Sequence, residues 1–259
     1  FGNPQIGAAG NAITAIYAEA NNSNDLGAAV GTVTCGLKNS GCFQFYEKGA
    51  ILWSPTTGAW ESFGPIRTQY GQLGFENSSL GYPVGPVYCG IKDGGCYQQY
   101  QSGYIVGIPA SGWWNSTGAI RARWAQLGFE NGTLGYPTGN EQCTLKNGGC
   151  FQFFQNGAIV GSPASGWWES MGPIRNEWSK WNFENGRLGY ATGAPSCLEA
   201  SDKCMQPFQG GTIYYSQATG AKQVWGAVLG RYFAMGAGSS VLGYPTGNEQ
   251  CTLKNGGCF

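Results

Sequence analysis

The chain has 259 residues, with 14 basic and 14 acidic side chains, and only 11% of its residues are charged. A chain of this length can bury a sizeable core, but it lacks the excess charge that attracts nucleic acid or an anionic membrane, so neither is expected as a partner. It contains no histidine, so the usual proton carrier near neutral pH and the commonest metal ligand are both absent.

The chain has the features of a secreted protein. Its first residue is Phe1, and no apolar run reaches membrane-spanning length. We therefore expect no membrane span, and a mature or excised piece of a secreted protein.

The sequence is built from a repeated unit. Its ten cysteines form five CxxxxxxC pairs, and each pair follows the previous one after 54 residues. The runs LGAAVG, LGYPVG, LGYPTG, LGYATG and LGYPTG precede the five pairs in the same register. A period kept through five copies indicates a repeat protein with one structural unit per copy. The predicted units are residues 1–54, 55–108, 109–162, 163–216 and 217–259.

The last predicted unit is truncated. It lacks the equivalent of residues 44–54 of the first unit. We expect that either the native chain continues or another segment completes this unit.

One unit is predicted to contain a small sheet and a helix. FQFYE (43–47) and AILWS (50–54) have the β-rich composition and the glycine-marked bend of a hairpin. PTTG (55–58) predicts a further turn before AWES, so three short antiparallel strands are expected. GPIRTQYGQLG (64–74) then predicts a helix, with Pro in its first turn and Gly just past its end.

The predicted helices share an apolar face. Ile66, Tyr70 and Leu73 have the i, i+4, i+7 spacing of one side of a helix, which predicts that this side faces the core. The other copies keep the same face with Ile120, Trp124 and Leu127, with Ile174, Trp178 and Trp181, and more loosely with Ile13 and Tyr17 and with Val228, Tyr232 and Met235.

The cysteine pairs are predicted to form disulfides. Asn147 lies midway between Cys143 and Cys150 and Gly148 follows it, which predicts a tight turn ending in a left-handed glycine, with the cysteines face to face. Zinc is disfavoured, because zinc pairs are usually spaced CxxC and no histidine completes a ligand set. Disulfides place the protein outside the reducing cytosol. The predicted bridges are Cys35–Cys42, Cys89–Cys96, Cys143–Cys150, Cys197–Cys204 and Cys251–Cys258.

Together these elements predict an α+β repeat protein of five 54-residue units, each a short antiparallel β-meander plus one helix. Open arrays need polar caps at their terminal repeats, whereas the terminal copies here keep the apolar helix face. We therefore expect a closed, propeller-like ring with pseudo-fivefold symmetry. An open array is the alternative.

The sequence contains no familiar catalytic centre. There is no GxSxG elbow, no phosphate-binding GxxxxGK[ST] loop and no histidine to activate a nucleophile, so we predict no enzyme activity, no cofactor and no metal. Paired carboxylates remain, but a catalytic pair is normally unique. The acidic residues that stand out recur once per copy inside FEN: Glu76, Glu130 and Glu184.

These glutamates have two readings. They cap or pair locally with the arginines of the preceding helices, or arginine and glutamate line one recess per copy that binds the hydroxyls of a sugar or the groups of a peptide. The arginines are Arg67, Arg121 and Arg175.

Tryptophans that follow the PxxG turns form a second candidate surface. Two adjacent tryptophans in a strand point to opposite faces, so one of each pair leaves the core-facing side. That ring either packs against the neighbouring copy or forms an exposed platform that stacks on sugar rings. The residues are Trp60, Trp113, Trp114, Trp167 and Trp168.

The LGYPTG runs, with the helix GAIRARWAQLGFENGT before them, resemble the LGFP repeat family, with Tyr at the usual Phe position. The resemblance covers nearly the whole chain. LGFP repeats are found in secreted actinobacterial proteins, often behind a catalytic domain, and are thought to hold those proteins on the cell wall. The first copy departs from the pattern, because LGAAVG lacks the Tyr and the copy has neither the Arg nor FEN. The last copy has Gly238 at the position of the FEN glutamate, so both end copies depart and three good copies are left.

The resemblance implies a non-catalytic wall-anchoring module whose partner is a wall polysaccharide such as arabinogalactan or peptidoglycan, with a fused catalytic domain as a candidate part of the full-length protein. Multivalent carbohydrate binding at the cell wall is therefore the leading hypothesis. A structural or assembly role through the Trp and Arg surfaces is the alternative, and a hydrolase that uses the repeated carboxylates is a third.

Overall fold

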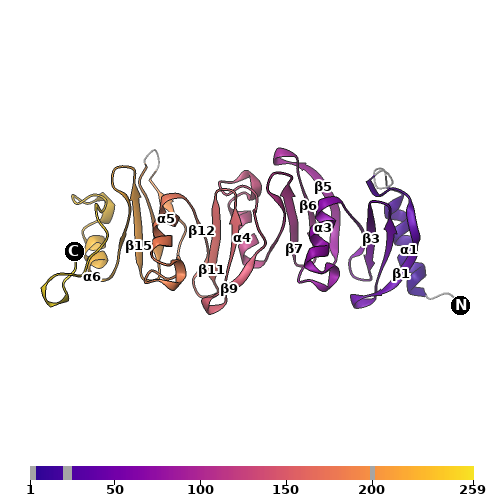
Figure 1. Cartoon of the computed structure of the whole chain (residues 1–259), viewed down its shortest axis with the longest axis horizontal. Coiled ribbons are helices and arrows are strands. Elements are labelled where there is room, and N and C mark those ends of the chain that lie inside the picture. Colours follow the sequence, from indigo (N-terminus) through magenta and orange to yellow (C-terminus); the bar gives the residue numbers. More distant parts are fainter. Residues whose placement is uncertain (1–3, 20–24, 199–201) are drawn as a thin grey trace. The chain divides into compact units, whose positions relative to one another are not determined.

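The structure is a computed structural model that describes residues 4–19, 25–198 and 202–259. It consists of four-stranded antiparallel sheets that alternate along the chain with single helices (Figure 1). The residues fall into two compact units. The first contains the chain up to Ala122 with residues 129–131 and 135–140, and the second contains residues 123–128, 132–134 and 141–259.

Each sheet is a meander, because its strands pair in chain order. The first sheet contains β1 (Ala29–Leu37), β2 (Gly41–Tyr46), β3 (Gly49–Ser54) and β4 (Gly58–Phe63), and the second contains β5 (Pro83–Ile91), β6 (Gly95–Tyr100), β7 (Gly103–Ile108) and β8 (Gly112–Thr117). The third contains β9 (Gln142–Leu145), β10 (Gly149–Phe154), β11 (Gly157–Ser162) and β12 (Gly166–Ser170), and the fourth contains β13 (Ser196–Cys197), β14 (Cys204–Phe208), β15 (Gly211–Ser216) and β16 (Gly220–Val224).

The helices separate the sheets along the chain. They are α1 (Pro4–Tyr17), α3 (Gly64–Leu73), α4 (Gly118–Gln126), α5 (Gly172–Lys180) and α6 (Gly226–Ala234). Short 3-10 turns follow four of the helices, at η2 (Phe75–Asn77), η4 (Phe129–Asn131), η6 (Phe183–Asn185) and η7 (Ala237–Ser239). We call one helix together with the sheet that follows it a module; the first to fourth modules begin with α1, α3, α4 and α5.

These modules confirm the predicted repeat of an antiparallel meander and one helix. Each meander has four strands where three were expected, because the strand that contains the first cysteine of a pair, β1 in the first module, also pairs with the next strand. The predicted boundary at residues 54 and 55 falls in the turn between β3 and β4, so a unit that keeps its sheet whole starts at its helix instead. None of the sheets among the described strands closes on itself, and the ring stays a prediction.

The cysteine pairs form the five predicted disulfides, each across a sequence separation of seven. Cys35 and Cys42 are directly opposed on β1 and β2, so the bridge closes the end of a hairpin. In the third module the turn between the cysteines has two left-handed residues, Asn147 at φ 56° and Gly148 at φ 71°. The left-handed glycine is therefore confirmed, and Asn tolerates the same region because its short polar side chain bonds locally.

Each internal helix within a unit packs against two sheets. In Figure 1, α3 lies beside β6 and β7 of its own module, and it also contacts β8 of that module and β4 of the preceding one. Its residues Ile66 and Tyr70 share one buried cluster with Leu52 of the preceding sheet and Ile105 of the following sheet. This confirms the predicted apolar face, and it shows that the helix is enclosed by apolar surface from both sides.

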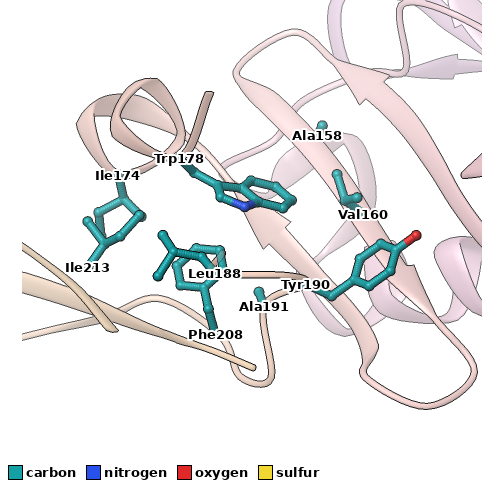
Figure 2. Close-up of a cluster of buried hydrophobic side chains, with 9 residues drawn as sticks. All are labelled: Ala158, Val160, Ile174, Trp178, Leu188, Tyr190, Ala191, Phe208 and Ile213. Carbon is teal, nitrogen blue, oxygen red and sulfur yellow. The ribbon is translucent and has the colours of Figure 1, made fainter. Parts of the chain in front are cut away.

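The cluster around α5 repeats this arrangement in the second unit. Figure 2 shows the Trp178 indole above Leu188 and Phe208, with Val160 of β11 on the opposite side from Ile174 and Ile213. Trp178 is 1% exposed, and its indole nitrogen donates to the Gly189 carbonyl at 3.1 Å. The buried indole ring stabilises the core by removing a large apolar area from water, and the hydrogen bond of its nitrogen fixes the orientation of the ring.

In the second, third and fourth copies, the tyrosine of the LGYP or LGYA run joins its module to the disulfide hairpin of the preceding module by a hydrogen bond. Tyr190 is fully buried, and its hydroxyl donates to the Lys146 carbonyl at 2.7 Å. In Figure 2 that hydroxyl points away from Leu188 and Phe208. Tyr82 makes the same bond to the Lys38 carbonyl at 2.6 Å. The hairpin residue next to the second cysteine is Gly149, where a Cβ would lie 2.1 Å from the Tyr190 oxygen.

Buried glutamines add a second tie between successive sheets. Gln98 is fully buried, and its Nε2 donates to the Glu61 carbonyl at 2.6 Å and to the Gly85 carbonyl at 3.1 Å. Gln206 makes the equivalent pair of bonds in the second unit. A buried amide with fixed partners specifies one register, because any slip leaves it unsatisfied.

Candidate functional site

One arginine in each of three helices lies on the flank of its helix: Arg67, Arg121 and Arg175. In α3 the adjacent Ile66 and the nearby Tyr70 are buried in the core. Successive helical residues are rotated by about 100°, so Arg67 leaves the core and extends over the sheet of the preceding module.

The Arg67 guanidinium lies close to two aromatic rings. Its central carbon is 5.8 Å from the centroid of the Phe45 ring on β2 and 5.1 Å from that of the Phe75 ring in η2. Both distances are within the roughly 6 Å over which a cation is attracted to a ring face. With Glu76 these residues form what we call the first arginine cluster (Arg67, Phe45, Phe75 and Glu76).

The second unit contains an equivalent cluster. Arg175 lies 5.5 Å from the Phe153 ring on β10 and 5.2 Å from the Phe183 ring in η6. We call these residues, with Glu184, the third arginine cluster. Each member is 108 residues beyond its counterpart in the first cluster.

Neither Arg67 nor Arg175 has a counterion among the described residues. Burial lowers the pKa of both guanidinium groups, because desolvation disfavours the charged form. One terminal nitrogen of each, Nη1, is buried without a hydrogen-bond partner in the part of the chain that the structure describes. Folding therefore leaves donor capacity at both arginines that their own packing does not use.

The FEN glutamates bond to their own neighbours. Asn77 donates from Nδ2 to Glu76 at 3.1 Å, and Asn185 donates likewise to Glu184 at 2.6 Å. The predicted local pairing is thus with asparagine, and the described residues contain no Arg–Glu ion pair in these clusters. Asn22, which replaces the FEN glutamate in the first copy, lies outside the described residues.

The first cluster surrounds a cavity that both charged groups line. Its volume is about 140 Å³, and Arg67 and Glu76 contribute its polar walls. The rest of its wall is apolar: Leu37, Phe43, Phe45, Ala50, Leu52 and Phe75. A donor and an acceptor in a mainly apolar recess are the usual composition of a small-molecule site.

The phenylalanine of each FEN run has a left-handed backbone. Its φ is 52° at Phe75, 53° at Phe129 and 48° at Phe183. This conformation is unusual for a bulky residue and costs on the order of 1–3 kcal/mol. The Phe75 ring packs edge-on against Tyr70 at 5.3 Å, which holds it next to Arg67.

The second cluster contains Arg121, Tyr104, Phe129 and Glu130 and has a different ring arrangement. Arg121 lies 3.8 Å from the centroid of the Tyr104 ring and 5.7 Å from that of Phe129. Asn131 donates to Glu130 at 3.0 Å, as in the other clusters. The ring under the guanidinium therefore comes from β7, not from the strand before it.

The predicted tryptophans are all partly buried, and none is exposed. Trp60, Trp114 and Trp168 occupy the same position in three copies, and each indole nitrogen donates to the backbone carbonyl three residues before it. The acceptor is Thr57 for Trp60, at 2.8 Å, Ser111 for Trp114 and Ser165 for Trp168.

The first tryptophan of one pair and the second tryptophan of another contact different cores. Trp113 packs against the core around α3, whereas Trp168 packs against the core around α5. Arg123 lies 4.9 Å over the Trp168 ring and forms an ion pair with Glu169 at 2.7 Å. Trp113 and Trp114 also line a groove of about 310 Å³ with Pro65, Thr68, Gln69, Gln72 and Gly112. Their predicted role in ligand binding stays a prediction.

Two groups of side chains have the composition of a metal site, Glu141 with Cys143 and Cys150, and Glu249 with Cys251 and Cys258. Their sulfurs are joined in disulfides, so no thiolate is present to bind a metal. No helix in the described part of the chain is both long and apolar enough to span a membrane.

Repeated sheet-and-helix modules, closed by disulfides and carrying three arginine clusters, define a tandem-repeat protein that presents several similar surfaces. The LGFP repeat family model matches residues 26–78, 80–132, 134–186 and 188–240, and the chain therefore belongs to this family. The family matches number four, against five predicted units. No curated protein matches the chain significantly.

The rings that complete the clusters were not among the predicted site residues. Phe45 lies in the predicted strand FQFYE (43–47), whereas Phe153 and the phenylalanine of FEN were assigned no role. The signal was present, because Phe45 and Phe153 occupy the same position of the 54-residue period.

Proposed function

We propose that the protein is a non-catalytic, multivalent module of a secreted protein that binds cell-wall polysaccharide, with arabinogalactan and peptidoglycan as candidate partners. The binding sites are among the arginine clusters. The observation that carries the proposal is the cavity of the first cluster, where a desolvated arginine, a glutamate and two aromatic rings meet. The rings offer a face to the C–H side of a sugar, and the two charged groups donate to and accept from its hydroxyls.

A further feature supports this proposal. The five disulfides fit an oxidising, extracellular location. Whether the modules close into a ring or form an open array, one polymer that engages several weak sites gains about a hundredfold or more over a single site.

The test is cosedimentation with purified, insoluble actinobacterial cell wall. The protein is expected in the pellet at low and at moderate salt, because each cluster contains one positive and one negative side chain, has no net charge and gains little from long-range attraction. Short oligosaccharides are expected to bind poorly, because they engage one site at a time. Protein that stays in the supernatant at both salt concentrations contradicts the proposal.

A variant pair separates the clusters from other surface arginines. Arg67→Ala combined with Arg175→Ala is expected to remove binding. Arg187→Ala is the matched control, because Arg187 also lies over an aromatic ring, 4.5 Å from Trp225, but belongs to no arginine cluster. Equal loss of binding in both variants would show that general cationic character, not the clusters, holds the polymer.

An assembly role through protein contacts is the second candidate. It is favoured by the groove of about 310 Å³ that Trp113 and Trp114 line with Pro65, Thr68, Gln69 and Gln72. Aromatic side chains, tryptophan among them, are enriched in protein interfaces. Concentration-dependent oligomers in light scattering, without wall binding, would favour this role.

A further inference from the structure

The three arginine clusters differ at one pair of directly opposed strand residues. In the first cluster, Phe45 of β2 faces Ala50 of β3, and in the third, Phe153 of β10 faces Ala158 of β11. In the second cluster the opposed pair is Gln99 and Tyr104. In the second cluster the aromatic ring is therefore on the following strand, β7, and the residue opposite it is glutamine and not alanine.

This exchange changes what lies beside the arginine. The Phe45 and Phe153 rings are 47% and 44% exposed, and they lie more than 5 Å from their guanidinium groups. Tyr104 is partly buried, and its ring lies 3.8 Å from the guanidinium carbon of Arg121. In the first cluster the corresponding residue, Ala50, is part of the cavity wall. Tyr104 thus places a ring where the first cluster has space.

The arginine side chains differ accordingly. In Arg67 and Arg175 the terminal nitrogen Nη1 is buried without a partner, whereas in Arg121 the corresponding unpartnered buried atom is Nε, near the base of the group. The end of Arg121 is therefore less enclosed than the ends of the other two.

We propose, on the basis of the function proposed above, that only the first and third clusters bind a sugar ring, and that Tyr104 fills the second cluster from within. The tyrosine also indicates which ligand fits. It is a six-membered ring with a hydroxyl, stacked on a guanidinium, so the group bound by the open clusters is a single six-membered sugar ring within a longer polymer. The protein is then bivalent, although its sequence carries three copies of the motif.

Exchanging the strand pairs tests this proposal on the whole chain. Gln99→Phe with Tyr104→Ala converts the second cluster to the open type and is expected to tighten wall binding at least tenfold, because a third site engages the polymer. Phe45→Gln with Ala50→Tyr closes the first cluster and is expected to weaken it at least tenfold. Arg121→Ala is expected to change binding less than twofold. Arg121→Ala that weakens binding as much as Arg67→Ala overturns the proposal.

Soluble competitors test the ligand. A soluble polymer of six-membered sugar rings is expected to displace the protein from the wall, and one of five-membered rings is not. Displacement by the five-membered polymer alone overturns the assignment of the ring.

A measurement that needs no ligand keeps the two proposals apart. Modification of arginine by phenylglyoxal, followed by peptide mass spectrometry on the native protein, is expected to be several-fold faster at Arg121 than at Arg67 and Arg175, and slower at Arg121 once Gln99→Phe and Tyr104→Ala are introduced. Equal rates at the three arginines overturn the distinction between open and filled clusters. Wild-type protein that fails to bind the wall overturns the proposed function and the sugar assignment, while the modification rates still decide whether Tyr104 fills its cluster.

Discussion

The substitution Gly149→Ala tests the tie between a disulfide hairpin and the next module. A Cβ at this position would lie 2.1 Å from the Tyr190 hydroxyl oxygen, 2.8 Å from Cζ of the same ring and 2.9 Å from the Gly161 carbonyl oxygen. All three distances are below 3.0 Å, which is shorter than the van der Waals contact of a Cβ atom with another heavy atom. The tyrosine must therefore move, and its hydrogen bond to the Lys146 carbonyl breaks.

The expected loss in the free energy of unfolding follows from these contacts. Loss of the hydrogen bond costs about 1 kcal/mol, and the forced displacement in a packed site costs about 1–3 kcal/mol. Alanine restricts the unfolded chain and returns up to about 1 kcal/mol. The net destabilisation is about 1–4 kcal/mol, measured by urea unfolding under non-reducing conditions with tryptophan fluorescence.

Two variants make the result specific. Tyr190→Phe alone is expected to cost about 1 kcal/mol, and the double variant less than the sum of the two, because both changes act on the same hydroxyl. Gly230→Ala is the control of opposite sign: it lies in α6 with nothing within 4 Å of its Cβ position, so alanine is expected to stabilise by up to about 1 kcal/mol. A Gly149→Ala variant that unfolds within about 0.5 kcal/mol of wild type, which is the error expected for independent sites, would contradict the predicted clash. An effect that adds fully to that of Tyr190→Phe would contradict it as well.

Three further outcomes are expected. Reduction of the disulfides should lower the midpoint of thermal unfolding markedly, because each short loop is worth about 2.5 kcal/mol in the chain-entropy treatment; calorimetry with and without a thiol reductant measures it. Ala237→Gly should stabilise by about 1 kcal/mol in urea unfolding, because Ala237 has a left-handed φ of 49° that glycine adopts without strain. Burial raises the pKa of Tyr46 and of Tyr136 to about 12, whereas the pKa of tyrosine in the unfolded state is about 10. As the pH rises, the unfolded state therefore ionises first, so the free energy of unfolding should be highest below about pH 10 and fall between about pH 10 and 12. Circular dichroism and tyrosinate absorbance measure this loss.

Local chemistry explains why much of the fold was predictable. Helix spacing identified Ile66 and Tyr70 as buried, and the short run between Cys143 and Cys150 indicated a bridged hairpin with a left-handed glycine. Both features depend on residues only a few positions apart. The contact of Tyr190 with Lys146 joins residues 44 positions apart, so no local pattern identified it.

The candidate site was predicted only in part. One arginine and one glutamate per copy were identified, and in the first cluster they do line one cavity. Their pairing was not anticipated correctly, because Asn77 satisfies Glu76 from the adjacent position. The left-handed backbone of Phe75 could not be read from the sequence either, since the residue type disfavours it.

The enclosure of α3 between two sheets affects how such a protein can change over generations. A deletion that separates one sheet from the helix packed against it would expose apolar surface on both the sheet and the helix. Removal or duplication of one whole 54-residue period instead brings equivalent apolar surfaces back into contact. Array length can therefore change only in complete steps. Exchange of a single opposed pair of residues, as at Gln99 and Tyr104, would change the number of proposed ligand-binding clusters and leave the length of the chain unchanged.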